Sequence, residues 1–384
     1  RFRTNILDWL KHNGADLQPL LLGGRMTKKY TALIDIDTLI VHSALAGQQS
    51  SVIVKHNKTG WTREFSNQTE FFGGWQKKDG GWLAEVNAKK IEKGLEPVSA
   101  DEFTIEPLVR LISDTISEDG SVITPEIIVK GRFKSKIEAI TNQPWCKDFK
   151  ICYGVGKNFR YDIAETVPYK NSRPAKPILF DVVRDYMLWK YKDHMLTEEG
   201  VESDDLMGQE MHKAWMRAKR QHQNLDTVAV FIDKDLAQFP CLQYNFDKPE
   251  LGLIEIDPLT AAKNLGTQLL MGDTIDSIPG LPKLPDELLE RYKLRKTQGL
   301  GEKTARGVVS SASTPKEVFE RVVEAYKLYY GDVRMQFVSH TGVFTDRDWL
   351  DHLNEMFRLL RMRTDVKKDV GHVKDFLAKM GIEV

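Results

Sequence analysis

Nine carboxylates in four short groups carry the strongest chemical signal in this sequence. They run from residue 35 to residue 276: Asp35 and Asp37; Glu202, Asp204 and Asp205; Asp233 and Asp235; Asp273 and Asp276. One such pair at a strand end is more often a turn or a helix cap than a set of ligands. Four such groups at the ends of successive elements indicate a metal-binding site, because converging like charges cost stability unless cations compensate them.

The ligand chemistry of these acids indicates both the metal and the reaction. Oxygen ligands without His or Cys favour Mg²⁺ or Mn²⁺ over Zn²⁺. Two such ions about 4 Å apart suit phosphodiester hydrolysis, since one activates water and the other stabilises the leaving oxygen. The acids therefore predict a two-metal hydrolase, either a metallonuclease or an enzyme with phosphatase-like chemistry.

A basic and aromatic stretch lies between the first and second acid groups. Its candidate DNA-binding residues are Lys157, Arg160, Tyr169, Lys170, Arg173 and Lys176. On its own such a stretch is more often a charged loop that faces water. The functional interpretation is that the cations neutralise phosphate while an aromatic ring stacks on an unpaired base.

A glycine-rich turn precedes a predicted helix near residue 300. Its residues Gly299, Gly301, Lys303 and Thr304 could cradle a DNA phosphate with backbone N–H groups and the helix dipole. The same spacing also fits an ordinary helix-turn-helix corner. Nearby cations favour the DNA backbone as ligand: Arg291, Lys293, Arg295, Lys296 and Arg306.

Composition indicates a globular protein. The 384 residues include 55 cations and 55 anions, so the formal net charge is zero. Without the nine grouped acids the balance is 55 − (55 − 9) = +9, so net charge does not exclude a nucleic-acid partner. Three cysteines are too few for a disulfide framework, and no apolar run reaches the ~20 residues that span a bilayer. We expect buried thiols and a soluble protein of the cytoplasm, with no membrane partner.

Strands and helices alternate along the chain and should position the acids. Strands are predicted at 30–37, 148–153 and 227–233, and amphipathic helices at 177–191 and around 207–218. This alternation predicts an α/β fold with a mostly parallel, twisted sheet flanked by helices, whose ligands bind outside the carboxyl ends of the strands. A hairpin is expected within residues 50–72, and a helix over 100–116.

Changes in residue composition and in the expected secondary structure along the chain suggest four regions. Residues 1–28 form an N-terminal extension, and 29–270 form the α/β domain with an insertion at about 50–145. Short helices with Gly and Pro turns over 271–345 form a helical module, and 346–384 form a helical tail.

Taken in order, several motifs resemble those of the bacteriophage-type 5′ nucleases, the flap endonucleases and 5′→3′ exonucleases related to the 5′ nuclease domain of bacterial DNA polymerase I. The motifs span about residues 30–310: Leu33-Ile-Asp-Ile-Asp37, Pro168-Tyr-Lys-Asn-Ser-Arg173, Gly200-Val-Glu-Ser-Asp-Asp205, Phe231-Ile-Asp-Lys-Asp235, Gly272-Asp-Thr-Ile-Asp-Ser-Ile-Pro-Gly280 and Gly299-Leu-Gly-Glu-Lys303.

The resemblance implies a PIN-like nuclease domain and a helix-three-turn-helix module that grips duplex DNA, with a monovalent cation such as K⁺. It implies that the catalytic metal is held by Asp35, Glu202 and Asp204, with Asp204 also bridging to a second ion. The second site would contain Asp205, Asp233, Asp235 and Asp273, with Asp276 close by. Lys170 and Arg173 match the family's cations that contact the scissile phosphate.

One departure concerns the first metal site. The family has a further Asp before the basic stretch, and here that position falls on Val155, within one residue. The missing carboxylate suggests reduced activity, an engineered change, or a substitute such as Asp37. The insertion and residues 281–298 are also longer than in compact members.

Three functions follow as hypotheses. The first is a metal-dependent nuclease that cuts DNA, or the RNA of hybrids, at 5′ ends or flaps during replication or recombination, in a bacterial or phage-infected cytoplasm, alongside replication proteins. The second is a weakly active or inactive member that binds branched DNA because Val155 replaces a ligand. The third is a PIN-type ribonuclease that acts on single-stranded RNA. The glycine turns at 272–307 argue against it, because such domains generally lack that module.

Overall fold

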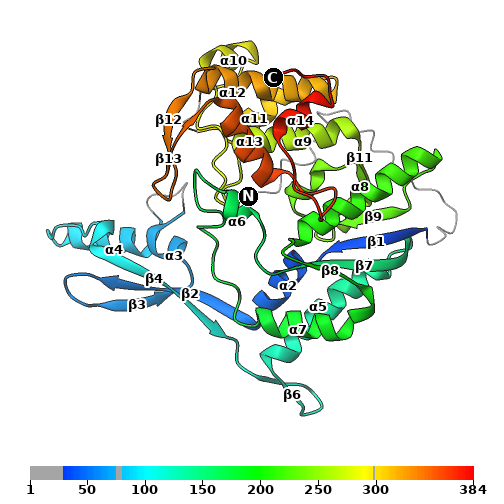
Figure 1. Ribbon diagram of the computed structural model, residues 1–384. Helices are drawn as coiled ribbons and strands as arrows, with labels where there is room; N and C mark the ends of the chain where they lie inside the picture. Colours follow the sequence, from blue (N-terminus) through cyan, green and yellow to red (C-terminus); the bar gives the residue numbers. More distant parts are fainter. Residues whose placement is uncertain (1–28, 75–79, 297–298) are drawn as a thin grey trace. The chain divides into compact units, whose positions relative to one another are not determined.

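The computed structural model describes residues 29–74, 80–296 and 299–384, and these divide into two compact units (Figure 1). Unit 1 contains the described residues up to 36, together with 139–173 and 194–384, and unit 2 contains 37–138 and 174–193. The predicted extension at 1–28 lies outside the described residues. Residue 270 lies within unit 1, and most of the predicted insertion at about 50–145 lies in unit 2. The predicted division into four regions stays a prediction.

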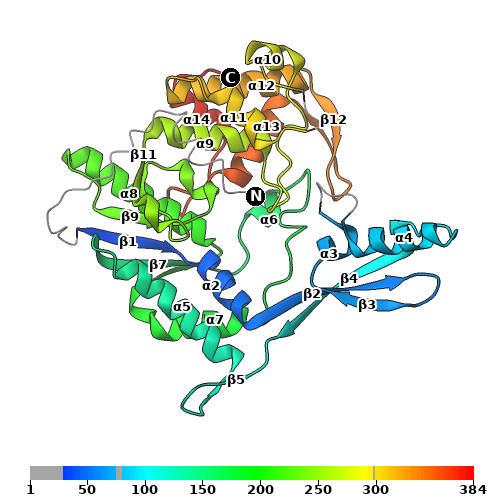
Figure 2. The ribbon, with the colours of Figure 1, turned by 180° about the vertical axis from the view of Figure 1, so that it is seen from behind.

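Within the described part of unit 1, a six-stranded sheet has the order β11-β10-β9-β1-β7-β8. Its strands are β1 (Tyr30–Asp35), β7 (Cys146–Val155), β8 (Met195–Glu199), β9 (Thr227–Val230), β10 (Cys241–Tyr244) and β11 (Leu253–Ile256). All neighbours pair in parallel except β10 with β11. Figure 2 shows β1 between β9 and β7. The predicted α/β class and mostly parallel sheet are confirmed.

An apolar core fixes helix α8 against this sheet. Helix α8 (Ser203–Gln221) buries Met207 and Met211 in a cluster with Leu33 of β1 and Cys152 of β7. Residues 32–34 of β1 are almost wholly buried, as expected for a strand covered on both faces. Cys146, Cys152 and Cys241 are all buried, as predicted.

The rest of unit 1 is mainly helical. Its elements are the last residue of η3 (Lys192–His194), α6 (Arg160–Ile163), η4 (Lys234–Gln238), η5 (Pro249–Leu251), α9 (Pro258–Met271), α10 (Asp286–Arg291), α11 (Glu302–Val309), α12 (Pro315–Tyr330), β12 (Met335–Val338), β13 (Phe344–Arg347), α13 (Trp349–Leu360) and α14 (Val373–Ala378). One hydrophobic cluster joins α9, α11, α12 and α13, for example through Leu269, Val308, Val322 and Phe357. The helical tail therefore shares its core with the helical module.

Unit 2 contains a small antiparallel sheet and several helices. Its elements are α2 (Asp37–Ala44), η1 (Leu45–Gly47), β2 (Gln48–His56), β3 (Thr62–Phe65), α3 (Gln68–Phe72), α4 (Trp82–Glu92), η2 (Ala100–Glu102), β4 (Phe103–Leu111), β5 (Thr115–Ile116), β6 (Val122–Ile123), most of α5 (Pro125–Thr141) and α7 (Phe180–Lys190). The predicted hairpin is confirmed, because β2 pairs antiparallel with β3.

The predicted helix over 100–116 is wrong. Residues 103–111 form β4 and pair with β2 from His56↔Phe103 to Gln48↔Leu111. The alternating Phe103 and Ile105 pack in the small aromatic core of unit 2, and Pro107 would interrupt a helix. The helix was predicted from the helical spacing of Leu108, Leu111 and Ile112, which was therefore misleading.

No helix in the described residues is long and apolar enough to cross a membrane.

Candidate active site

Two predicted acids stand where parallel strands of unit 1 end, and a third stands at the start of a helix. Asp35 is the last residue of β1 and is buried, and Asp233 follows β9 as the N-cap of η4. Asp204 lies in the first turn of α8. Burial raises the pKa of the Cys152 thiol, and the negative charges of Glu210, Asp35 and Asp204 add to the shift. Asp35 and Asp204 are far apart in the sequence, but in the folded chain both lie close enough to Cys152 to affect the pKa of its thiol.

A tight glycine-closed loop positions Asp273 and Asp276. Gly272 has φ of 71°, and a Cβ on it would lie 2.1 Å from the Ile278 carbonyl oxygen. The backbone N–H of Asp273 donates to the Ile278 carbonyl at 2.8 Å, and the reverse bond is 2.7 Å. Only glycine fits such a close backbone approach, so the Gly272–Gly280 spacing of the sequence fixes where these acids stand.

Asp233, Asp235 and Asp273 form a crowded carboxylate cluster. Burial raises the pKa of Asp235 well above its usual value, and the charges of Asp233 and Asp273 raise it further. Burial likewise raises the pKa of Asp233, against the hydrogen bond from the Asp235 N–H at 2.9 Å. Gln268 donates to Asp235, and the Lys234 Nζ lies 3.9 Å from Asp273 Oδ2. A bound cation would relieve the repulsion among these carboxylates, so the cluster favours cation binding.

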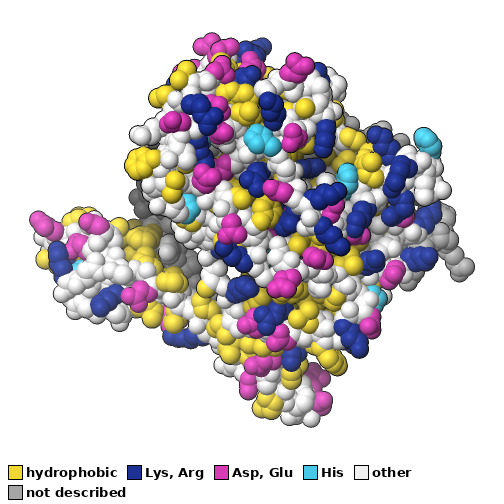
Figure 3. Space-filling view, viewed as in Figure 1, with side chains coloured by type: hydrophobic (Ala, Val, Ile, Leu, Met, Phe, Trp, Pro, Cys, Tyr) yellow, Lys and Arg dark blue, Asp and Glu magenta, His cyan; other side chains and the backbone are white. Residues whose placement is uncertain are grey.

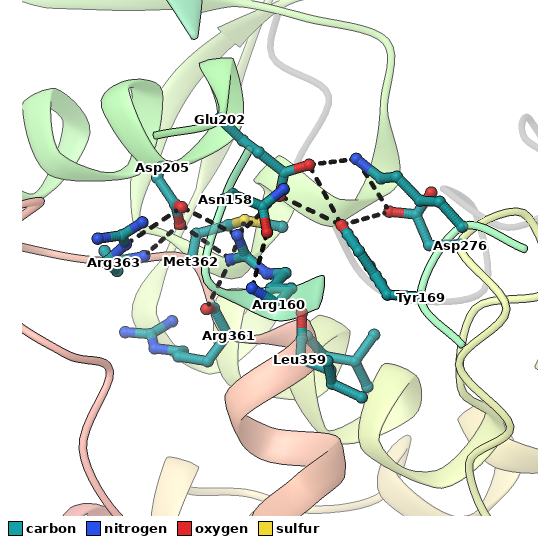
Figure 4. Close-up of polar contacts among 12 residues, drawn as sticks. Asn158, Arg160, Tyr169, Glu202, Asp205, Asp276, Leu359, Arg361, Met362 and Arg363 are labelled. Atoms are coloured by element: carbon teal, nitrogen blue, oxygen red, sulfur yellow. Dashed lines mark hydrogen bonds and ion pairs between the residues drawn. The ribbon is translucent and has the colours of Figure 1, made fainter. Parts of the chain in front are cut away.

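A second network surrounds Glu202, the N-cap of α8 (Figure 4). Arg160 Nη1 donates to Glu202 Oε2 at 2.7 Å, and Lys170 Nζ pairs with Oε1. The Tyr169 hydroxyl lies 3.2 Å from Glu202 Oε2 and donates to Asp276 Oδ2 at 2.8 Å. Tyr169 thus bridges carboxylates of two predicted acid groups.

The loop that carries Lys170 and Arg173 is held against the Gly272–Gly280 loop. Arg173 donates to Asp276 Oδ1 at 2.9 Å, and the Lys170 N–H donates to the Asp276 carbonyl at 2.9 Å. Lys170 has a φ of 59°, in the left-handed region that residues other than glycine rarely adopt. The hydrogen bond to the Asp276 carbonyl helps to hold the Lys170 backbone in this conformation. The two predicted phosphate cations are therefore gathered beside the acids.

Two predicted DNA contacts need correction. The Arg160 side chain has no exposed surface, so it cannot meet a DNA backbone, and it binds carboxylates instead. Tyr169 is also buried, with its ring against Tyr161 and its hydroxyl on Glu202 and Asp276, so it offers no face for a base. Both residues support the acids from inside unit 1.

Asp205 also differs from its predicted role as a metal ligand. Its side chain is fully buried, and Arg160 donates to both of its oxygens at 2.9 Å. Arg363 adds a backbone N–H bond at 2.9 Å and a side-chain bond at 3.3 Å. A metal ion at Asp205 would have to displace these donors.

The other predicted contacts are more scattered. Lys157 is exposed and pairs with Asp162, and Gly301 is the N-cap of α11 with Gly299 and Lys303 exposed beside it. Thr304 is buried in the first turn of that helix. Asp37 and Lys176 belong to unit 2.

On the face drawn in Figure 3, Lys and Arg are interspersed with Asp and Glu, in keeping with the zero net charge.

Val155 is the position near the end of β7 where an additional acid could stand. A Cβ on Gly154 would lie 2.2 Å from the Val201 carbonyl oxygen, and Gly156 has φ of 83°. The Val155 side chain is 42% exposed. Of the three positions that the motif allows, only residue 155 has room for a carboxylate and an ordinary backbone.

The donor set suits a hard divalent cation, since it consists of carboxylate oxygens with raised pKa values in the Asp233 cluster. Within the described residues, however, no three acidic, His or Cys side chains are already arranged to hold an ion. Cations of the chain occupy part of the set instead, with Arg160 and Lys170 on Glu202 and Arg173 on Asp276.

The sequence did not point to Arg363 or Gln268. Arg363 lies in the C-terminal tail, 158 residues beyond its partner Asp205, and Gln268 lies on α9, 33 residues beyond Asp235. Neither residue belongs to a motif. Only the folded chain brings them to the acids.

No protein-family model and no curated protein matches this chain. Solved structures of proteins from bacteriophage T5 do match it. One is a T5 protein co-crystallised with metal ions, with 14% identity, a TM-score of 0.33, and coverage of 51% of this chain and 82% of that one. Another is the T5 flap endonuclease in a pseudo-enzyme-product complex with DNA and metal ions, with 15% identity, a TM-score of 0.31, and coverage of 51% and 80%.

A third match is the T5 5′-exonuclease with bound zinc, with 17% identity, a TM-score of 0.30, and coverage of 51% and 80%. These structures are of the same kind of nuclease that the sequence motifs resemble. Because identity and TM-score are both low, these matches do not establish a function for this chain.

Proposed function

We propose that this protein is a nuclease that depends on Mg²⁺ or Mn²⁺ and hydrolyses DNA phosphodiester bonds at 5′ ends or 5′ flaps. The observation that carries the proposal is the cluster of Asp233, Asp235 and Asp273, in which desolvation and mutual repulsion raise the pKa values of Asp233 and Asp235, while Lys234 Nζ lies as far as 3.9 Å from Asp273 Oδ2. Lys170 and Arg173 lie beside the neighbouring acids Glu202 and Asp276. Unit 1 therefore contains both carboxylates that favour a metal ion and Lys and Arg side chains that favour a phosphate.

Two sets of residues would hold the metal ions. Asp35, Glu202 and Asp204 form the first, and Asp233, Asp235, Asp273 and Asp276 form the second. Bound ions would activate water and stabilise the charge on the leaving oxygen. Oxygen ligands alone favour Mg²⁺ or Mn²⁺ for this role.

Lys170 and Arg173 would bind and polarise the phosphate that is cut. Both are ion-paired with acids in the structure, so they are already oriented toward the place where negative charge develops. An incoming phosphate would compete with Glu202 and Asp276 for these cations. Binding of DNA would then free carboxylate oxygens for metal.

The turn at Gly299–Thr304 would hold the DNA duplex away from the cut. Gly301 caps α11, and the N-terminus of an eight-residue helix offers N–H groups and a dipole to a phosphate without reading bases. A K⁺ ion at this turn belongs to the same proposal. So do a role in replication or recombination, contact with replication proteins and a cytoplasmic location.

The test uses a duplex with a 5′ single-stranded flap, incubated with Mg²⁺, Mn²⁺ or EDTA. We expect metal-dependent cleavage, reduced at least about 100-fold in Asp233→Asn, because a ligand of the metal site is lost. Asp226→Asn is the matched control. Asp226 immediately precedes β9, at the opposite end of the strand from Asp233, and pairs with the partly exposed Arg217.

The outcomes separate the proposed function from its alternatives. Equal cleavage by Asp233→Asn and Asp226→Asn would refute the role of the cluster. Faster cleavage of single-stranded RNA than of flap DNA would identify a ribonuclease. Tight binding of flap DNA without cleavage in any metal would leave only a DNA-binding protein.

A further inference from the structure

Asp205 has no acceptor site left for a metal ion. A carboxylate offers about four lone-pair positions. In Asp205, Oδ1 accepts from Arg160 Nη2 and from the Arg363 N–H, both at 2.9 Å. Oδ2 accepts from Arg160 Nη1 at 2.9 Å and from Arg363 Nε at 3.3 Å. The side chain is fully buried, so water does not compete for these positions.

Arg160 is saturated in the same way. Its Nε donates to the Leu359 carbonyl at 2.8 Å, and Nη2 reaches the Arg361 carbonyl at 3.2 Å and Met362 Sδ at 3.3 Å. The remaining N–H groups meet Asp205 and Glu202. Every donor of the buried guanidinium has an acceptor, which gives the group one defined orientation.

This arrangement joins three distant segments of unit 1. Arg160 belongs to α6, Glu202 and Asp205 to the start of α8, and residues 359–363 to the C-terminal tail (Figure 4). Arg363 closes the arrangement, because it also donates to the Gly200 carbonyl at 3.3 Å and to the Val366 carbonyl at 2.9 Å. The first turn of α8 is therefore fixed from both sides.

Adjacent residues on this turn have different surroundings. Successive helical residues point about 100° apart, so Asp204 and Asp205 cannot face the same partner. Asp205 is fully buried against the arginines, whereas Asp204 is partly exposed. Glu202 uses Oε2 for Arg160 and Oε1 for Lys170.

We infer that Arg160 and Arg363 are positioning residues that grip Asp205 and thereby set the orientation of Glu202 and Asp204 for metal binding. Asp205 then serves as an anchor of α8, and the C-terminal segment 359–363 supports the metal site. This inference rests on the proposed function. Residues that orient ligands from behind typically change metal affinity or activity by about 10–100-fold.

The test measures Mn²⁺ binding to the full-length chain by electron paramagnetic resonance, because free and bound Mn²⁺ give different signals. Arg160→Lys keeps the charge but loses the planar fork. We expect its half-saturating Mn²⁺ concentration to rise about 10–100-fold. Arg363→Gln, which leaves Arg160 in place, should raise that concentration in the same direction and decides the question if Arg160→Lys does not fold.

Arg347→Lys is the matched control. Arg347 is also buried between two acids, Glu355 at 2.6 Å and Glu165, and it lies on β13 outside the proposed metal sites. We expect it to lower thermal stability and leave the half-saturating Mn²⁺ concentration unchanged. Asp204→Asn should reduce the number of bound ions, whereas Asp205→Asn should retain it.

Several outcomes would overturn the inference. These are equal Mn²⁺ affinity in Arg160→Lys and Arg347→Lys, loss of an ion in Asp205→Asn, and a wild-type chain that binds no Mn²⁺. A chain that binds Mn²⁺ with the predicted dependence on Arg160 but does not cut DNA would refute the proposed function and keep the positioning role.

Discussion

Neutralising Asp235 should stabilise the metal-free protein at neutral pH and weaken its response to Mg²⁺. Burial and the charges of Asp233 and Asp273 raise the pKa of Asp235 well above its usual value, so the ionised carboxylate destabilises the folded state. Asp235→Asn removes the charge and keeps the shape and an oxygen that can accept from Gln268. That hydrogen bond weakens by about 1 kcal/mol when its acceptor becomes neutral. The raised pKa shows that the repulsion and burial outweigh this bond.

The sign of the pH dependence follows from proton binding. Because the folded pKa of Asp235 is raised, the folded protein binds more protons than the unfolded chain between the ordinary Asp value of 3.8 and the raised one. Wild-type stability therefore falls across this window as pH rises. The advantage of Asp235→Asn should be small near pH 4 and grow toward pH 7.

Mg²⁺ should reverse the order of stability. An ion at 100 times its Kd stabilises the folded state by about 2.7 kcal/mol, or about 5–10 °C in Tm at about 2–4 °C per kcal/mol. Asp235→Asn lacks a proposed ligand and should show a much smaller shift. Asp226→Asn, with its partly exposed partner Arg217, should respond like the wild type.

Scanning calorimetry with and without Mg²⁺, at several pH values, measures these quantities. The reasoning is refuted if metal-free Asp235→Asn is less stable than the wild type at pH 7. It is equally refuted if Mg²⁺ stabilises both proteins to the same extent.

Three further predictions concern other parts of the site. Lys170→Met should lower the single-turnover cleavage rate about 100–1,000-fold, because it removes a donor to the charged phosphate; an unchanged rate at saturating DNA would contradict this. Val155→Asp should lower the half-saturating Mn²⁺ concentration in a binding titration, since the exposed position accepts a carboxylate at little cost; identical titration curves would show that no ligand is missing there. Arg160→Met should reduce the free energy of unfolding in urea by about 3–5 kcal/mol, because it removes the guanidinium that pairs with both oxygens of the buried Asp205 and leaves only the Arg363 donors; a loss below about 1 kcal/mol would show that the pair is not structural.

The sequence predicts the framework of unit 1 well, because its signals are local. A continuous apolar run produces β1, apolar residues at helical spacing produce α8, and the glycines at 272 and 280 close the loop that carries Asp273. Each of these elements depends on residues close together in the chain. The placement of acids at strand ends follows from the parallel sheet.

The predictions that were wrong concern residues with distant partners. Arg160 looked like a surface cation because it belongs to a stretch of cations that includes Lys157 and Lys170, whereas its burial depends on residues 359–363. The strand β4 looked helical because only its pairing with β2 settles its period. Local patterns do not reveal such long-range contacts.

The proposed metal-dependent 5′ nuclease activity depends on the grouped acids and cations of this chain. The most direct measurement compares a 5′-flap duplex with a 3′-flap duplex of the same sequence, each in Mg²⁺ and in EDTA, and maps the cut sites. We predict Mg²⁺-dependent cutting at or near the 5′ flap, with the 3′ flap left intact and no cutting in EDTA. Absence of cutting in Mg²⁺, or equal cutting of both flaps, would contradict the account.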